Sequence, residues 1–171
     1  MVSGGLVLPD AIAADLLEHA RRELPNEACG ILSGSRADGW ATTFHPARNE
    51  EASPLRYSVH PEDLVRITFA IDEAGEDLLA IFHSHTRSPA VPSATDRRAA
   101  MYPDAFYVLA TLADPTAPPE QALRAWTITD GEAVEAPLSV AQPGSSTDST
   151  EPEGRSTSTS SPGEPSSPPE R

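Results

Sequence analysis

The clearest candidates for chemistry in the sequence are two histidines, His83 and His85, at the end of an apolar segment. The residues from Leu78 to His83 read LLAIFH, which is typical of a buried strand. Side chains alternate along a strand, so both imidazoles would leave the same face, about 6–7 Å apart by the rise of a strand. The pair could therefore converge on one metal ion. A structural role at the end of the strand is the alternative.

A carboxylate follows in the next expected element. Ser93 should open a helix that runs to about Met101, and Asp96 falls in its first turn. The positive end of a helix stabilises a carboxylate there as the anion. Two imidazoles and one carboxylate make a three-ligand zinc site with an open fourth position, which can activate water and polarise a carbonyl. Ser93-x-x-Asp96 is also an ordinary helix-capping pattern, so on its own it identifies no metal site.

The combination of these parts is more specific than each alone. An acidic residue, Glu27, precedes His83-x-His85, and a gap of seven residues separates the histidines from Ser93-x-x-Asp96. This order and spacing resemble the JAMM motif of the MPN-plus metalloproteases.

The resemblance extends beyond the motif, over about residues 5–140. The segments that carry it are PNEACGILSG (25–34), RN (48–49), RY (56–57), FHSHT (82–86) and PSATD (92–96). The last two resemble the small actinobacterial members in particular. Thr86 stands where many bacterial relatives have proline, but this is not a ligand position.

The resemblance implies an α/β fold of the MPN (JAB) type, which is cytidine-deaminase-like, with a mixed β-sheet sandwiched between helices. It implies one Zn²⁺ ion per chain, held by His83, His85 and Asp96. It also implies that Glu27 is the general base, and that the hydroxyl of Ser93 stabilises the oxyanion of the reaction.

The resemblance also implies a partner. The actinobacterial members act on a ubiquitin-like sulfur-carrier protein and release cysteine from its C-terminus, which is a step in cysteine biosynthesis. The alternatives are a general (iso)peptidase for other ubiquitin-like or peptide tails, and a non-catalytic MPN scaffold. MPN domains often pair, so the resemblance allows a homodimer.

Other polar residues show weaker patterns. Cys29 is expected to be a small buried apolar group, because that is the usual state of a free cysteine. Arg87 and the pair Arg97-Arg98 flank the site and could bind a substrate carboxylate, with a solvated charge as the alternative. The remaining histidines have no ligand partner at useful spacing and are expected to be structural or exposed: His19, His45 and His60.

The rest of the sequence alternates between helical and extended patterns, which by itself predicts an α/β domain. Helices are expected over 10–24, with Asp10 as the cap and Pro25 as the stop, and over 61–75. Leu64, Val65 and Phe69 should form the apolar stripe of the second helix. Strands are expected over 28–33, 40–45, 78–83 and 105–112, with a short extended piece at 56–59 and a hairpin of 123–129 and 132–138 around Asp130-Gly131.

Composition excludes several classes of function. The formal net charge of −14 disfavours nucleic acid and anionic membranes as partners. A single cysteine excludes a Cys-rich zinc site, and with it the zinc site of nucleobase deaminases. No apolar run approaches the roughly 18–20 residues of a membrane span, and the first residues lack the basic region of a secretory signal. We therefore expect a cytoplasmic protein.

The chain changes composition near its end. Residues 142–171 are dominated by Ser, Thr, Pro, Glu and Gly and lack aliphatic and aromatic side chains. Such a stretch has nothing to bury against the entropic cost of ordering its backbone. We expect one domain over residues 1–141 and a disordered tail over 142–171.

Overall fold

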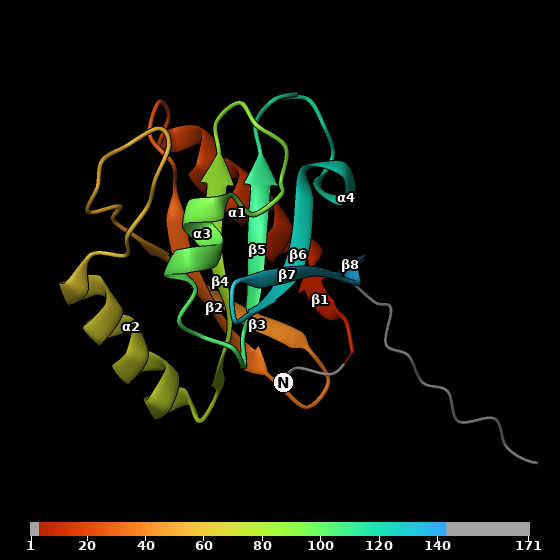
Figure 1. Cartoon of the computed structure of the whole chain (residues 1–171). Helices are drawn as coiled ribbons and strands as arrows, with labels where there is room; N and C mark the ends of the chain where they lie inside the picture. The colour runs from red at the N-terminus through yellow and green to blue at the C-terminus, as the bar shows by residue number, and fades with distance from the viewer. Residues whose placement is uncertain (1–3, 143–171) are drawn as a thin grey trace, which may run out of the picture.

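A mixed eight-stranded β-sheet runs through the computed structural model, which describes residues 4–142 (Figure 1). Its strands are β1 (Leu6–Pro9), β2 (Cys29–Ser35), β3 (Trp40–Ala47), β4 (Asp77–His85), β5 (Phe106–Thr111), β6 (Leu123–Thr129), β7 (Glu132–Ala136) and β8 (Leu138–Ala141). Their spatial order is β7-β6-β5-β4-β2-β3-β1-β8. β4 therefore lies in the interior, antiparallel to β2 and parallel to β5.

Helices lie on both sides of this sheet. They are α1 (Asp10–Arg22), α2 (Pro61–Ala74), α3 (Ala94–Ala99) and α4 (Pro119–Ala122). Figure 1 shows α1 behind the sheet and α3 in front of it. The predicted α/β class, with a mixed sheet between helices, is confirmed. Within residues 4–142, no helix has both the length and the apolar character needed to cross a membrane.

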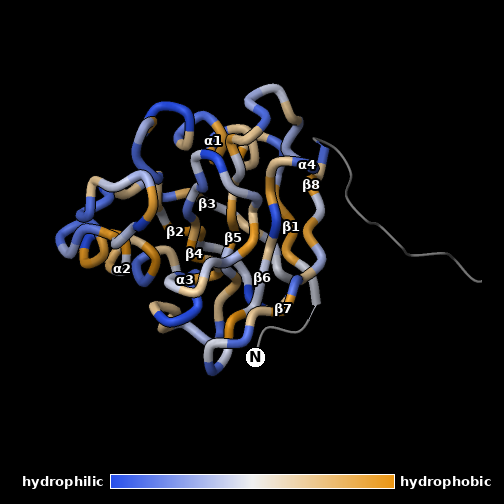
Figure 2. The backbone as a smooth tube through the Cα atoms, turned by 45° about the horizontal axis from the view of Figure 1, so that its top comes forward, coloured by the Kyte–Doolittle hydropathy of each residue, from blue (hydrophilic) through white to orange (hydrophobic). Residues whose placement is uncertain are grey.

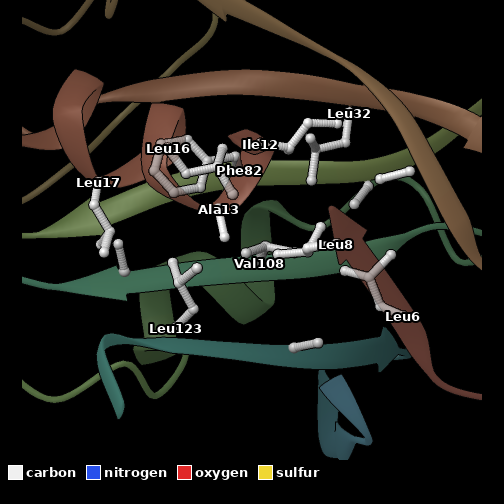
Figure 3. Close-up of a cluster of buried hydrophobic side chains, with 14 of the residues drawn as sticks. Leu6, Leu8, Ile12, Ala13, Leu16, Leu17, Leu32, Phe82, Val108 and Leu123 are labelled. Carbon is white, nitrogen blue, oxygen red and sulfur yellow. The ribbon is translucent and has the colours of Figure 1, made fainter. Parts of the chain in front are cut away.

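The core has two parts, one on each face of the sheet. Phe82 packs with Leu16 of α1 on one face (Figure 3), while its neighbour Ile81 packs with Ile67 of α2 on the other. This division follows from the alternation of side chains along a strand. Figure 2 shows the hydrophobic residues concentrated in the central strands and the hydrophilic ones in the loops. The long apolar segments of β4 and β5 are thus explained by burial on both faces.

The parallel pairing of β1 with β8, which joins the two ends of the domain at one edge of the sheet, was not predicted. The expected hairpin strand 132–138 is wrong at its end, because β7 stops at Ala136 and Leu138–Ala141 pairs with β1 as a separate parallel strand. Pro137 has no N–H to continue a ladder. Its carbonyl instead accepts a hydrogen bond from the Leu6 N–H at 2.8 Å.

Two expectations about helices are corrected. Asp10 is the first residue of α1 rather than its cap, and Pro9 holds the capping position without a side-chain hydrogen bond. In α2 the predicted apolar stripe is wrong, since Val65 and Phe69 are 56 % and 67 % exposed. The buried face consists of residues at i, i+4 and i+8: Asp63, Ile67 and Ile71.

Two further expectations concern a loop segment and the end of the chain. The extended piece at 56–59 forms no strand and contributes a single bridge between Asn49 and Val59. The tail expected over 142–171 lies outside the described residues, apart from Gln142.

Candidate metal centre

The two histidines predicted from the sequence meet at the C-terminal end of β4. Their Nε2 atoms are 3.3 Å apart. Asp96 approaches from the start of α3, and its Oδ2 lies 3.6 Å from the His83 Nε2 and 3.4 Å from the His85 Nε2. All three side chains are buried, with exposures of 0 %, 5 % and 8 % for His83, His85 and Asp96. They form a group that could hold a metal ion.

The size of this triangle fits a small divalent ion. A tetrahedral zinc ion holds its nitrogen and oxygen ligands at about 2.0–2.1 Å, which places the ligand atoms about 3.3–3.4 Å from one another. The observed separations of 3.3, 3.4 and 3.6 Å are close to that requirement. Two imidazoles and a carboxylate are also a donor set that suits zinc.

Hydrogen bonds fix the orientation of His85 and Asp96, whereas the buried Nδ1 of His83 has no partner among the described residues. The Nδ1 of His85 donates to the Pro89 carbonyl at 2.7 Å, which leaves the Nε2 lone pair free to face the centre. Ser93 and Asp96 form a reciprocal capping box: the Ser93 N–H donates to the Asp96 Oδ2 at 2.6 Å, and the Asp96 N–H donates to the Ser93 Oγ at 3.1 Å. The capping pattern and the metal-site pattern are therefore compatible, because the cap holds the carboxylate in place.

The electrostatics of the triad favour the metal-binding forms of His83 and Asp96, and the protonated form of His85 while no cation is bound. Burial lowers the pKa of His83, which keeps its imidazole neutral. Burial opposes the ionisation of Asp96, but hydrogen bonds with both histidines outweigh it and hold the pKa of Asp96 far below its ordinary value. Burial also lowers the pKa of His85, but bonds to Asp96 and the Pro89 carbonyl outweigh it and raise that pKa overall. The His85 proton occupies the place that a cation would take, so metal binding would release it.

Glu27 lies just before β2 and is 4 % exposed. Its Oε2 is buried and has no hydrogen-bond partner among the described residues. Burial raises the pKa of Glu27 to about 7, with His85 lowering it and Asp96 raising it. A buried carboxylate without a partner is costly. A cation, or a water molecule between Glu27 and the triad, would offset that cost, so this orphaned oxygen also fits a metal centre.

A cavity of about 560 Å³ opens beside the triad. Glu27, His85 and Ser93 line its polar end. The remaining lining residues are Leu24, Pro25, Pro54, Leu55, Thr86, Arg87 and Ser88. Leu55 is 78 % exposed, so the cavity is bordered by apolar side chains at the surface. The structure thus brings together all five predicted site residues.

The loop of residues 48–60 contains residues that support the site and that sequence reasoning missed. Tyr57 stacks on His83 with ring centroids 4.2 Å apart. The Asn49 amide donates to the Glu27 carbonyl and to the Arg56 carbonyl, both at 3.0 Å. The side-chain Oδ1 of Asn49 accepts from the N–H groups of Glu51 and Ser58. The only signal in the sequence was the resemblance of RN (48–49) and RY (56–57) to a connecting segment of the family, which assigned them no role.

Ser84, between the two histidines, was also missed. Its Oγ accepts from the Ala28 N–H at 2.9 Å, and its own N–H donates to the Ala28 carbonyl at 3.0 Å. These bonds fix the segment that carries Glu27 against β4. A small hydroxyl between two candidate ligands was the available signal.

The residues expected to be structural behave accordingly. Cys29 is buried, and burial raises the pKa of its thiol to about 12, which makes it unreactive. His19 donates to the Cys29 carbonyl, and His45 bonds to the Ser33 Oγ. His60 caps α2 by accepting from the Glu62 N–H.

Comparison with known proteins places this geometry in a family. Residues 9–129 match the family described as prokaryotic homologues of the JAB domain. The chain is 37 % identical over 142 residues to the CysO-cysteine peptidase of Mycobacterium tuberculosis, which covers 81 % of this chain and 95 % of that protein. It is 39 % identical over 114 residues to a desampylase of Haloferax volcanii, covering 64 % of this chain and 82 % of the relative.

Solved structures agree with the sequence comparisons. A protein from Desulfitobacterium hafniense superimposes with a TM-score of 0.73 at 32 % identity, covering 80 % of this chain and 93 % of that one. The family predicted from the JAMM motif is thereby confirmed, and the chain belongs to the prokaryotic homologues of the JAB domain.

Proposed function

We propose that this protein is a zinc metallopeptidase that hydrolyses the C-terminal amide of a ubiquitin-like sulfur-carrier protein and releases cysteine. The observation that carries the proposal is that the buried, unpaired Glu27 carboxylate shares one cavity with His85, whose Nε2 forms a compact triad with His83 and Asp96. A structural role for these groups gives no reason to bury an orphaned carboxylate beside two imidazoles.

The residues divide the reaction among them. His83, His85 and Asp96 would hold the zinc ion, which when bound would supply a Lewis acid that polarises the scissile carbonyl and lowers the pKa of water. Glu27 takes a proton from the attacking water and passes it to the leaving amine. Burial raises the pKa of Glu27, to about 7 without a bound cation, and a carboxylate raised toward neutral pH can both accept and return a proton.

Ser93 serves the oxyanion that develops as the carbonyl is attacked. Its Oγ accepts the Asp96 N–H, and a serine hydroxyl still has one hydrogen that it can donate. Ser93 also lines the cavity beside His85 and Glu27. One hydroxyl can thus cap α3 through its lone pair and stabilise the oxyanion through its hydrogen.

The cavity suits an extended and narrow substrate. The segment between His85 and Ser93 has only seven residues, so it leaves little room for a large recognition insertion. Pro54 and Leu55 form an apolar border opposite Thr86 and Arg87, and the Thr86 hydroxyl donates to the Pro54 carbonyl at 3.4 Å. A flexible, Gly-rich carrier tail fits such a groove better than a folded surface.

The identity to the CysO-cysteine peptidase, over nearly the whole length of that relative, supports cysteine as the leaving group. On this proposal the protein acts in cysteine biosynthesis, in the cytoplasm. A second candidate is an isopeptidase for proteins conjugated to a ubiquitin-like modifier. The 39 % identity to the haloarchaeal desampylase favours it.

One experiment tests the proposal against its alternatives. The purified chain and its Glu27→Ala variant are analysed for zinc, and each is then given two substrates. One is a sulfur carrier with a C-terminal cysteine, and the other is the same carrier joined to a lysine side chain. Intact-mass spectrometry follows both. We expect about one zinc in each protein and loss of cysteine with the wild type alone.

Each other outcome has a distinct meaning. Zinc with cleavage of the lysine conjugate alone would favour the isopeptidase. Zinc without any cleavage would contradict both substrates, and a protein without metal would leave the non-catalytic scaffold as the better account.

The homodimer, and the division into a domain of residues 1–141 with a tail, stay predictions. Gel filtration and a chain truncated after Ala141 test them.

A further inference from the structure

The cavity beside the triad contains one arginine, Arg87, and this arginine has no partner. Within residues 4–142 it makes no hydrogen bond or ion pair. The other described arginines except Arg97 all make at least one. The chain carries 26 acidic residues, so potential partners are abundant. Arg87 is exposed, so water solvates it in the free protein and its guanidinium is available to a ligand that enters the cavity.

The surroundings of Arg87 indicate the chemistry of that ligand. Ser88 lines the same cavity, and the structure gives its hydroxyl no partner among the described residues. The other lining residues are apolar or uncharged, apart from Glu27 and His85 at the metal end. A guanidinium presents a planar set of donors that matches a carboxylate, and a nearby hydroxyl adds one more donor. The cavity therefore combines a site for amide hydrolysis with donors for a carboxylate.

Arg87 is close enough to His85 along the chain to bind a group next to the triad. Arg87 follows His85 by two positions, which is about 7 Å of extended backbone, and its side chain can reach back over that length. In a C-terminal residue the α-carboxylate is joined to the same Cα as the amide nitrogen that leaves. A carboxylate bound near the triad is thus the one next to the bond being cut.

The structure also separates Arg87 from the other two arginines that flank the site in the sequence. Arg97 and Arg98 line a different cavity, with Ile128 and Asp130. Arg98 donates to the Thr95 Oγ1 at 3.3 Å. Of the three arginines, Arg87 alone shares the cavity of Glu27 and Ser93.

We propose that Arg87, assisted by Ser88, binds the free α-carboxylate of the leaving residue and so selects carriers that end in one additional amino acid over carriers conjugated to a lysine side chain. This inference rests on the proposed peptidase function. In a lysine conjugate the leaving amine has no carboxylate beside it, so Arg87 would find no ligand. Arg87 is thus a specificity-determining residue rather than a catalytic one.

The test measures binding and cleavage separately. The probes are two carrier-tail peptides ending in Gly-Gly-Cys, one with a free C-terminal carboxylate and one with a carboxamide. Their thiols are S-methylated so that sulfur cannot bind zinc. Affinity is measured with the zinc-loaded full chain in the Glu27→Gln background, which traps the complex, and kcat/KM is measured in the Glu27 background.

We expect the acid to bind about tenfold more tightly than the amide, which is the low end for a charge-assisted hydrogen bond because Arg87 is exposed in the free protein. Arg87→Gln should remove this preference by weakening the acid and leaving the amide unchanged, and Arg87→Lys should restore part of it. Arg98→Gln is the matched control and should keep the full preference. The ratio of kcat/KM values should follow the ratio of affinities.

Equal affinities of the acid and the amide in the Arg87 protein would overturn the inference, as would a preference that survives Arg87→Gln. Either result leaves the peptidase proposal intact if both peptides are cleaved. A preference that depends on Arg87, without cleavage of either peptide, would support the carboxylate site and contradict the proposed function.

Discussion

β4 and the loop of residues 48–60 meet at His83, and they are held in place by different means. β4 has ladder partners on both sides, β2 and β5, and its ligands continue that ladder to its last residue. The loop has no ladder: one isolated bridge joins Asn49 to Val59, and the Glu27 N–H donates to the Ser53 carbonyl at 2.8 Å. Side chains supply further bonds that hold it to its neighbours.

Two side chains hold the loop. The Arg48 N–H and its guanidinium Nε both donate to the Asp63 Oδ2 at 2.9 Å, which joins the loop to α2. The hydrogen bonds to Arg48 hold the pKa of Asp63 well below its usual range. Asn49 uses both donors and its acceptor oxygen to join the Glu27 carbonyl to the two ends of the loop.

The difference indicates how each region contributes to the site. A ladder fixes backbone positions to a fraction of an ångström, which metal ligands require. A loop held by a few polar side chains can adapt to a substrate, but each of those side chains matters. We therefore expect changes in β4 and α3 to abolish activity, and changes in the loop to weaken it.

The largest effect is expected from the ligands. His83→Ala should abolish zinc binding and lower kcat/KM by more than the about 10²–10³-fold that a lost oxyanion donor costs. The reason is that the remaining two ligands cannot complete a three-ligand site. Elemental analysis and peptidase assays measure both effects. His45→Ala, a histidine on β3 away from the triad, is the control and should keep zinc. Stoichiometric zinc in His83→Ala would show that the triad is not the metal site.

Glu27 should come next. Glu27→Gln should retain zinc and lower kcat by about 10²–10⁴-fold, the usual contribution of a general acid–base group. In the wild type only the ionised carboxylate can accept a proton, so kcat/KM should rise with pH until Glu27 is ionised. A bound cation favours the anion, so this limb should lie between the ordinary value near 4.5 and about 7. A full pH profile without an acidic limb would contradict the assignment of Glu27 as the base.

Ionisation of the same carboxylate should raise activity but lower the stability of the metal-free protein. Because burial raises the pKa of Glu27 from about 4.5 to about 7, the folded state binds more protons than the unfolded state between those values. The free energy of unfolding of the metal-free protein should therefore fall as pH rises through this window. Glu27→Gln should remove that dependence and stabilise the metal-free protein at pH 8, by up to about 3 kcal/mol. Urea unfolding in the presence of a chelator measures it, and an unchanged pH dependence would argue against a buried, unpaired carboxylate.

Substitution of Ser93 should have a smaller effect, with separate contributions to kcat and to stability. Ser93→Ala should lower kcat by about 10²–10³-fold through loss of the oxyanion donor, and should destabilise the protein by about 0.5–2 kcal/mol through loss of the cap. Ser93→Gly separates the two, because glycine is a tolerable cap but has no hydroxyl. Ser93→Thr keeps both functions. If Ser93→Gly kept the activity of the wild type, Ser93 would be a cap alone.

Features that depend on short segments could be predicted from the sequence, and those that depend on distant contacts could not. The triad of His83, His85 and Asp96 could be predicted because its members lie in two short segments with fixed spacing, and because strand alternation places His83 and His85 on one face. The parallel pairing of β1 with β8 could not, since it joins the two ends of the described chain and neither segment has a distinctive pattern. In α2 the sequence allows two faces to be buried, one with Val65 and Phe69 and one with Ile67 and Ile71. The second is buried, and it carries Asp63, whose contact with Arg48 the sequence does not reveal.

Asn49 is the clearest case of a residue whose role appears only in three dimensions, and it gives the smallest predicted effect. Asn49→Asp removes the two donors to Glu27 and Arg56 but keeps the acceptor. We expect about a tenfold loss of kcat/KM, the equivalent of about 1.4 kcal/mol, which is close to one or two net hydrogen bonds. Zinc content should not change, since the triad lies on β4 and α3. The freed loop should be cleaved faster by trypsin after Arg56. Asn26→Asp is the matched control, because it adds the same charge one residue from Glu27, and the Asn26 side chain makes no hydrogen bond among the described residues. If Asn49→Asp lost zinc, the loop would be part of the metal site rather than a support for Glu27, and the contrast between the two regions would fail.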